Sequence, residues 1–124
     1  MVHVNKFCTS ISCIDGRIQL PIQHWLKEKY NVDYVDTITE DGVDKLFSDK
    51  NNIQGIKSNT LLSINSHGSK LIMVSGHHDC TGNPVSKQEH AMQIKKAISI
   101  IQTWNKKVKV IGVWINEDWD LKIL

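Results

Sequence analysis

Two short runs of residues carry most of the chemical potential of this sequence. Cys13, Asp15 and Arg17 lie within the run CIDGR, and His77 and Cys80 lie within the run GHHDC. Two thiolates and an imidazole form a good ligand set for zinc, and three protein ligands leave the fourth tetrahedral position open for water or substrate. The residue types therefore indicate a catalytic metal site rather than a structural one, which usually has four protein ligands.

Each of these residues also has a simpler interpretation. A cysteine at the end of a strand is most often a small buried core residue, and a single His-x-x-Cys spacing is a weak signal. Asp15 and Arg17 could form a salt bridge that only stabilises a loop. The metal interpretation rests on the two motifs together, and it uses His77 rather than His78, because adjacent side chains project in different directions.

Strands and helices alternate in the hydrophobic pattern of the chain. Continuous apolar or β-branched runs predict strands, and apolar residues at helical spacing predict helices between them. The pattern therefore predicts a single domain over residues 1–124 with an α/β fold, in which a mostly parallel sheet has helices on both faces. The strands are expected at residues 7–13, 32–39, 70–76 and 108–116.

Capping and breaking residues predict where the helices begin and end. Pro21 is expected in the first turn of a helix over residues 20–30, where its missing N–H costs nothing. Ser58 is a candidate N-cap for a second helix, which Gly68 would end. Ser86, with Glu89 in a capping box, predicts the start of a third helix.

The expected sheet brings the two motifs together. In open parallel sheets, ligands bind beyond the carboxyl ends of the strands, at the point where the connections diverge to opposite faces. A Rossmann-like sheet of about four strands in the order 2-1-3-4 would make the first and third strands neighbours. Cys13, His77 and Cys80 would then surround a common centre.

The composition of the chain indicates which classes of binding partner are to be expected. The chain has 124 residues, 15 lysines and arginines against 13 acidic residues, and a formal charge of +2, which argues against binding to nucleic acid or to an anionic membrane. The sequence shows neither a targeting leader nor a membrane span, so we expect a cytoplasmic protein. Three cysteines in a reducing compartment favour metal binding, redox chemistry or packing over disulfides.

The order of the two motifs resembles the β-class carbonic anhydrases, whose pattern is Cys-x-Asp-x-Arg followed by His-x-x-Cys. The resemblance implies that Cys13, His77 and Cys80 bind Zn²⁺ and that Asp15 and Arg17 form the dyad that orients the attacking group. It also implies reversible hydration of carbon dioxide to bicarbonate by zinc-bound hydroxide, and a homodimer or higher homo-oligomer.

The expected dyad chemistry is simple. Asp15 can accept a hydrogen bond from zinc-bound water, and Arg17 can hold Asp15 bidentately and keep it ionised. If that pair broke, Asp15 could bind zinc itself and close the open position. Gly82 and Asn83, in the turn before the helix predicted at Ser86, are candidates for holding an anion such as bicarbonate at the helix N-terminus.

The sequence departs from the family pattern at two places near the expected site. The usual Arg-Asn-Ala-Gly run after the second strand is replaced by TITEDG at residues 37–42. The glycine that normally follows the last ligand is Thr81, with Gly82 one place later. Trp114 and Trp119 are candidates for covering the mouth of the site or for forming a subunit contact.

Other functions stay open at this point. A non-catalytic or regulatory zinc-binding module is the main alternative, and related scaffolds act on other small heterocumulenes such as carbonyl sulfide and carbon disulfide. A thiol redox protein that paired Cys13 with Cys80 would leave His77, Asp15 and Arg17 without a role.

Overall fold

The computed structural model describes residues 5–124, and within these residues five strands form one sheet in the order β2-β1-β3-β4-β5. The first four strands run parallel to one another, and β5 pairs antiparallel with β4. The sheet order 2-1-3-4 predicted from the sequence is confirmed, and β5 is an additional edge strand that the sequence did not predict. The strands are β1 (Phe7–Ser12), β2 (Tyr34–Thr39), β3 (Leu71–His77), β4 (Lys109–Ile115) and β5 (Leu121–Ile123).

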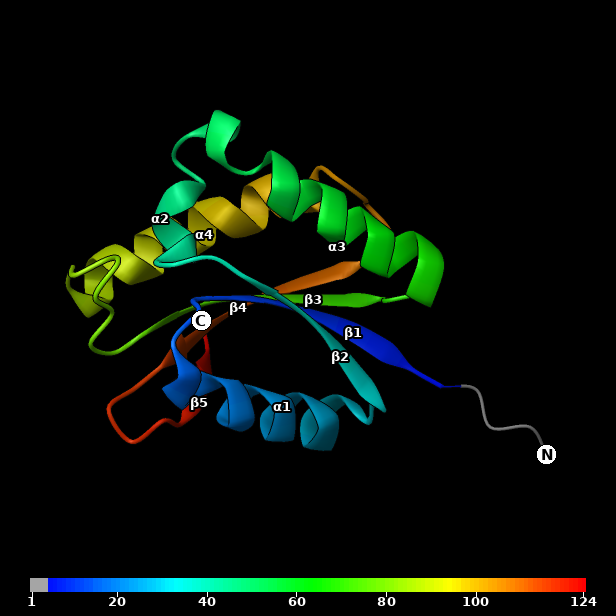
Figure 1. The fold of residues 1–124 in the computed structure, drawn as a ribbon, viewed down its shortest axis with the longest axis horizontal. Coiled ribbons are helices and arrows are strands. Elements are labelled where there is room, and N and C mark those ends of the chain that lie inside the picture. Colours follow the sequence, from blue (N-terminus) through cyan, green and yellow to red (C-terminus); the bar gives the residue numbers. More distant parts are fainter. Residues whose placement is uncertain (1–4) are drawn as a thin grey trace.

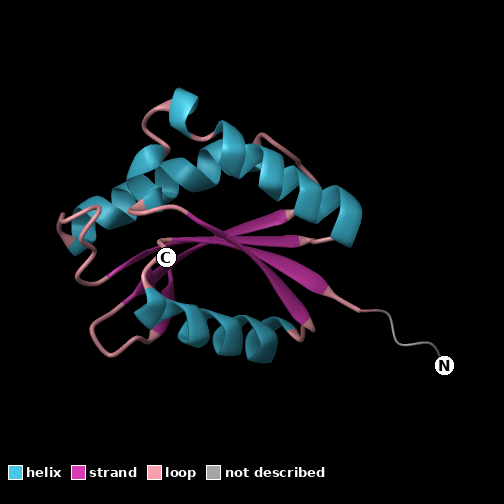
Figure 2. Cartoon of the chain, in the orientation of Figure 1, coloured by secondary structure: helices cyan, strands magenta, loops and turns pink. Residues whose placement is uncertain are grey.

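Helices cover both faces of the sheet (Figures 1 and 2). The helix α1 packs on one face, and the other three α-helices lie on the opposite face together with a short 3₁₀ helix, η1. None of the helices within residues 5–124 is long and apolar enough to cross a membrane. The helices are α1 (Gly16–Tyr30), α2 (Val43–Leu46), η1 (Lys50–Asn52), α3 (Gln54–His67) and α4 (Lys87–Gln102).

The central strand β3 is buried along its whole length, as expected for a parallel strand with helices on both sides. Its alternate side chains contribute to two cores. Ile72 and Val74 pack with the α2, α3 and α4 side, whereas Leu71 and Met73 pack with the α1 side.

Two predicted helix starts were wrong. The helix α1 begins at Gly16, four residues earlier than predicted, because the Asp15 side chain accepts a hydrogen bond from the Arg17 N–H and acts as an N-cap. Pro21 therefore lies inside the helix rather than in its first turn. Ser58 likewise lies within α3, which begins at Gln54 with Ile53 as the N-cap residue and no side-chain cap.

Two other capping predictions are confirmed. The Ser86 side chain accepts a hydrogen bond from the Glu89 N–H at the start of α4. Gly68 ends α3 in the left-handed conformation, with φ of 69°. Both helix ends lie where the sequence predicted them. Ser86 marks the end of the loop that carries Cys80 and the start of α4.

Candidate metal centre

Three predicted ligands converge at the carboxyl ends of two neighbouring strands. Cys13 directly follows β1, His77 is the last residue of β3, and Cys80 lies in the loop that follows β3. Because β1 and β3 pair in parallel, their carboxyl ends lie at the same edge of the sheet. Residues that are 67 positions apart in the sequence thus become neighbours.

The geometry of these three side chains fits one metal ion. The sulfur atoms of Cys13 and Cys80 are 3.9 Å apart, and all three ligand atoms lie within 4.8 Å of one another. All three residues are buried, with exposures of 4%, 1% and 4% for Cys13, His77 and Cys80. Within residues 5–124, this is the one group of three or more cysteine, histidine or acidic side chains close enough to share an ion.

The imidazole of His77 has one nitrogen committed and one free. Its Nδ1 lies 2.7 Å from the His78 carbonyl oxygen, which can only accept, so Nδ1 carries the proton of that bond. Its Nε2 is buried and has no hydrogen-bond partner. Among the described side chains, the same is true of the hydroxyls of Ser10 and Ser75. A buried, unpaired nitrogen beside two sulfurs is the donor arrangement that a metal ion would satisfy.

The pKa values of the two cysteines of the cluster are shifted in opposite directions. Burial by itself would raise the pKa of the Cys13 thiol, but the neighbouring His77 imidazole and the Gly42 N–H lower the pKa below its ordinary value. The Gly42 N–H donates to the Cys13 sulfur at 3.4 Å. Burial and the nearby Cys13 thiolate raise the pKa of Cys80 to about 12. Cys13 is thus the more acidic of the two thiols.

Asp15 and Arg17 form the pair that the sequence predicted. The Arg17 Nε lies 3.1 Å from Asp15 Oδ1, and Nη2 lies 2.8 Å from Oδ2, so the contact is bidentate. The hydrogen bonds from Arg17 lower the pKa of Asp15 to about 2. The carboxylate therefore stays ionised at any pH near neutrality.

Arg17 also contacts residues of two further loops, Asp79 after β3 and Trp119 between β4 and β5. Its Nη1 donates to the Asp79 carboxylate and its Nη2 to the Asp79 carbonyl, both at 3.1 Å. Its guanidinium lies 4.8 Å from the centre of the Trp119 ring, a cation–π contact. Trp119 thus packs on Arg17, whereas Trp114 is buried against His90. Covering of the mouth of the site by Trp119 stays a prediction.

Gly82 and Asn83 lie in the loop after Cys80, and both are engaged by the protein. The Gly82 carbonyl accepts a hydrogen bond from Lys45 Nζ at 2.7 Å. The Asn83 side chain is buried and donates to Asp44 Oδ1 at 3.0 Å and to Gln93 Oε1 at 2.7 Å. Anion binding by Gly82 and Asn83 stays a prediction, and the Asn83 amide could serve it only by giving up these bonds.

Sequence reasoning missed two acidic residues near the cluster. Asp41 lies 3.6 Å from the Cys13 sulfur, and Asp44 is buried against Nδ1 of His90 at 2.5 Å. The run TITEDG, which contains Asp41, was the available signal for the first. No local pattern marks Asp44, because its partner His90 comes from a helix that lies 46 residues further along the chain.

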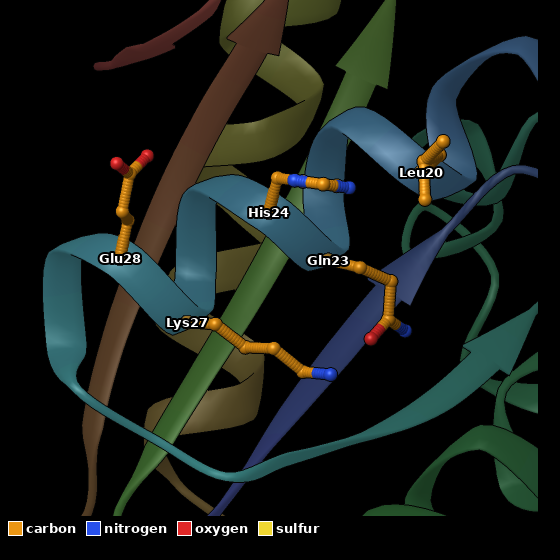
Figure 3. Close-up of a pocket in the computed structure, with 5 residues that line it drawn as sticks. All are labelled: Leu20, Gln23, His24, Lys27 and Glu28. Carbon is orange, nitrogen blue, oxygen red and sulfur yellow. The ribbon is translucent and has the colours of Figure 1, made fainter.

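A surface hollow elsewhere on the molecule contains none of the predicted site residues. It has a volume of about 600 Å³ and is lined by side chains of α1 alone (Figure 3). These side chains are Leu20, Gln23, His24, Lys27 and Glu28, whereas Ile18, Ile22 and Leu26 form the buried face of the same helix. The chemistry therefore concentrates at the sheet edge rather than in this hollow.

Comparison with known proteins points to one family. A family model described as "Putative carbonic anhydrase" matches residues 3–124. The chain is also similar to the crystal structure of β-carbonic anhydrase isoform I from the protozoan Trichomonas vaginalis, with a TM-score of 0.62 and 15% identity over 99% of this chain and 86% of that one. No curated protein matches the sequence.

A second solved structure agrees with the first. The chain is similar to a carbonic anhydrase from Streptococcus mutans, with a TM-score of 0.65 and 11% identity, again over 99% of this chain and 86% of the other. At these identities the two structures show a shared fold. The roles of individual residues in this chain have to be argued from its own geometry.

Proposed function

The chain belongs to the carbonic anhydrase family and has the fold of its β class, and from this premise we propose that it binds zinc and catalyses the reversible hydration of carbon dioxide to bicarbonate. The observation that carries the proposal is the buried cluster of Cys13, His77 and Cys80, in which the unpaired Nε2 of His77 faces two sulfurs. Two thiolates would neutralise a divalent ion, and borderline or soft ligands of this kind suit zinc.

Zinc bound there would acidify a water molecule in its fourth coordination position and so supply the nucleophile at neutral pH. The chain's own contribution is orientation. Asp15, ionised and held bidentately, would accept a hydrogen bond from the attacking water, so that a lone pair of that water points at the carbon of the substrate. Arg17 keeps the carboxylate in this orientation and away from the metal ligands.

The second role of Arg17 is to hold the surrounding loops. Through Asp79 it ties the start of α1 to the loop that carries Cys80, and Trp119 packs over its guanidinium. A dyad held from three sides loses little entropy when the substrate binds, which favours the reaction. Oligomerisation, which the family resemblance implies, and a location in the cytoplasm, which we expect from the sequence, are part of the same proposal.

Metal analysis combined with stopped-flow hydration of carbon dioxide tests the proposal. We expect about one zinc per chain and hydration that rises with pH between mildly acidic and alkaline conditions. Asp15→Asn should keep the zinc but lose most of the turnover, whereas Cys13→Ser should lose both. As a control, Glu28→Gln removes one negative charge from the exposed face of α1, the helix that Asp15 caps. This variant should change neither the zinc content nor the turnover.

The negative outcomes separate the alternatives. Zinc-loaded protein that hydrates carbon dioxide no faster than buffer would contradict the proposed reaction and favour a non-catalytic zinc module. Hydrolysis of carbonyl sulfide or carbon disulfide by that protein would point instead to another heterocumulene as substrate. Zinc occupancy well below one half after metal-replete expression would contradict the metal site itself.

A further inference from the structure

A carboxylate that the ligand motifs do not contain lies against the candidate metal centre. Oδ1 of Asp41 is 3.6 Å from the sulfur of Cys13, although the two residues are 28 positions apart. Asp41 itself is exposed, whereas Cys13 is buried. The negative charge of Asp41 therefore sits at the solvent side of a metal ligand.

Close packing of two loops holds Asp41 in this position. The loop between β2 and α2 lies on the loop after Cys80, and a Cβ on Gly82 would come within 2.4 Å of the Asp41 carboxylate atoms. A Cβ on Gly42 would likewise lie 2.7 Å from the Gly82 carbonyl oxygen. The Asp41 carboxylate thus occupies the space that the missing side chain of Gly82 leaves.

Two cations of the loops around the cluster, Arg17 and Lys45, are engaged by other groups. Arg17 is bound to Asp15 and Asp79, and Nζ of Lys45 donates to the Gly82 carbonyl. Among residues 5–124, no lysine or arginine forms a salt bridge with Asp41. Its charge therefore has no ion-pair partner among these residues.

We propose that Asp41 is a specificity-determining residue, whose fixed charge strengthens binding of the metal cation and weakens binding of anions at the open coordination position. This inference rests on the proposed function. A metal bound to the Cys13 sulfur at about 2.3 Å would lie within about 6 Å of Asp41 Oδ1. The arrangement favours an uncharged substrate and promotes release of an anionic product.

Coulomb's law sets the size of the expected effect. Two unit charges about 6 Å apart change a binding constant about 3-fold in a medium like water, and by a larger factor in a partly buried setting. The signs are opposite for the two ligands, because the carboxylate attracts the cation and repels the anion. Loss of structure would instead weaken both.

Cobalt substitution gives a readout that does not depend on turnover. Co²⁺ replaces zinc and reports on its ligands through visible absorption, so the affinity for Co²⁺ and then for thiocyanate can be measured in the wild type and in Asp41→Asn. We expect the variant to bind Co²⁺ at least about 3-fold more weakly and thiocyanate at least about 3-fold more tightly. Glu28→Gln, with the same change in net charge far from Cys13, should leave both affinities unchanged.

The outcomes distinguish this inference from the proposed function. Affinities of Asp41→Asn that equal those of the wild type, or that both fall, would overturn the role of Asp41 while leaving the metal site standing. A wild-type chain that binds no Co²⁺ would overturn the metal site and this inference with it. If the affinities shifted equally in Glu28→Gln and Asp41→Asn, the effect would come from net charge alone, and the specific role of Asp41 would be overturned.

Discussion

At the scale of single residues, the three cysteines occupy two different environments. Cys8 lies within β1 in the core beneath α1, and burial, reinforced by Asp36, raises the pKa of its thiol from 9.0 to about 11. Cys13 and Cys80 lie at the sheet edge with their sulfurs 3.9 Å apart. Thiolates are the reactive form, so Cys13, the one of the three whose pKa is lowered, should be the most reactive.

Alkylation should distinguish these thiols. With iodoacetamide at neutral pH, we expect metal-free native protein to be modified at Cys13 first, and zinc-loaded protein at none of the three cysteines. Cys8 should react only after unfolding, because it is both buried and protonated. Peptide mapping by mass spectrometry measures each site, and early modification of Cys8 in the folded chain would contradict the assignment.

The raised pKa of Cys8 also predicts a dependence of stability on alkaline pH. A pKa that is higher in the folded than in the unfolded chain contributes stability that is fully present below pH 9 and is lost as the pH rises through about 11. For a shift of about two pH units, the loss is at most about 3 kcal/mol.

Urea unfolding of the wild type and of Cys8→Ala between pH 8 and pH 11 measures this contribution. The variant starts with a lower free energy of unfolding because of the cavity it creates. The difference between the two proteins should then shrink as the pH rises. A difference that stays constant across this range would show that Cys8 does not titrate as its burial predicts.

At the scale of elements, α1 combines a structural and a chemical task at its first turn. Asp15 caps the helix through the Arg17 N–H at 2.9 Å, and the same carboxylate forms the dyad with the Arg17 side chain. The helix therefore begins at the site, and the residue that starts the helix is the one we propose to orient the attacking water.

Two substitutions of Asp15 should separate these tasks. Asparagine is a good N-cap but cannot form the ion pair with Arg17, so Asp15→Asn should keep the capping contribution, lose that of the ion pair, and lose most of the turnover. Asp15→Ala should lose the same activity and should be about 1 kcal/mol less stable than Asp15→Asn, because it also loses the cap. Denaturant unfolding and stopped-flow hydration measure the two effects, and equal stability of both variants would argue against the capping role.

At the scale of the whole molecule, the candidate metal centre joins parts of the chain that are distant in sequence. It connects the ends of β1 and β3 with the loop before α4, while Arg17 adds the start of α1 and the loop that carries Trp119 (Figure 1). An ion bound by the folded chain alone would therefore stabilise the whole fold.

Thermal unfolding with and without zinc should show this coupling. Free zinc at 1,000 times its dissociation constant adds about 4 kcal/mol, which raises Tm by on the order of 10 °C for a chain of this size. Chelation should reverse the shift. Cys80→Ser should show little response to zinc, and an equal rise in this variant would mean that zinc binds elsewhere.

Much of this architecture could be predicted from local patterns. The apolar run of β3 predicted a strand covered on both faces, and the Ser86 cap and the Gly68 stop predicted two helix ends. The start of α1 could not be predicted in the same way, because aspartate is favoured both in turns and at N-caps. The short strand β5 has three residues and only one neighbour, so its own sequence carries little signal.

The sequence by itself determined the candidate ligands and the dyad, since residue types and short spacings carry chemistry without knowledge of the fold. Tertiary structure alone decided which groups surround them. Asp41 reaches Cys13 because two loops pack through glycines, and Trp119 reaches Arg17 from the far end of the chain. Such contacts depend on the packing of the whole sheet and its helices, which no local spacing encodes.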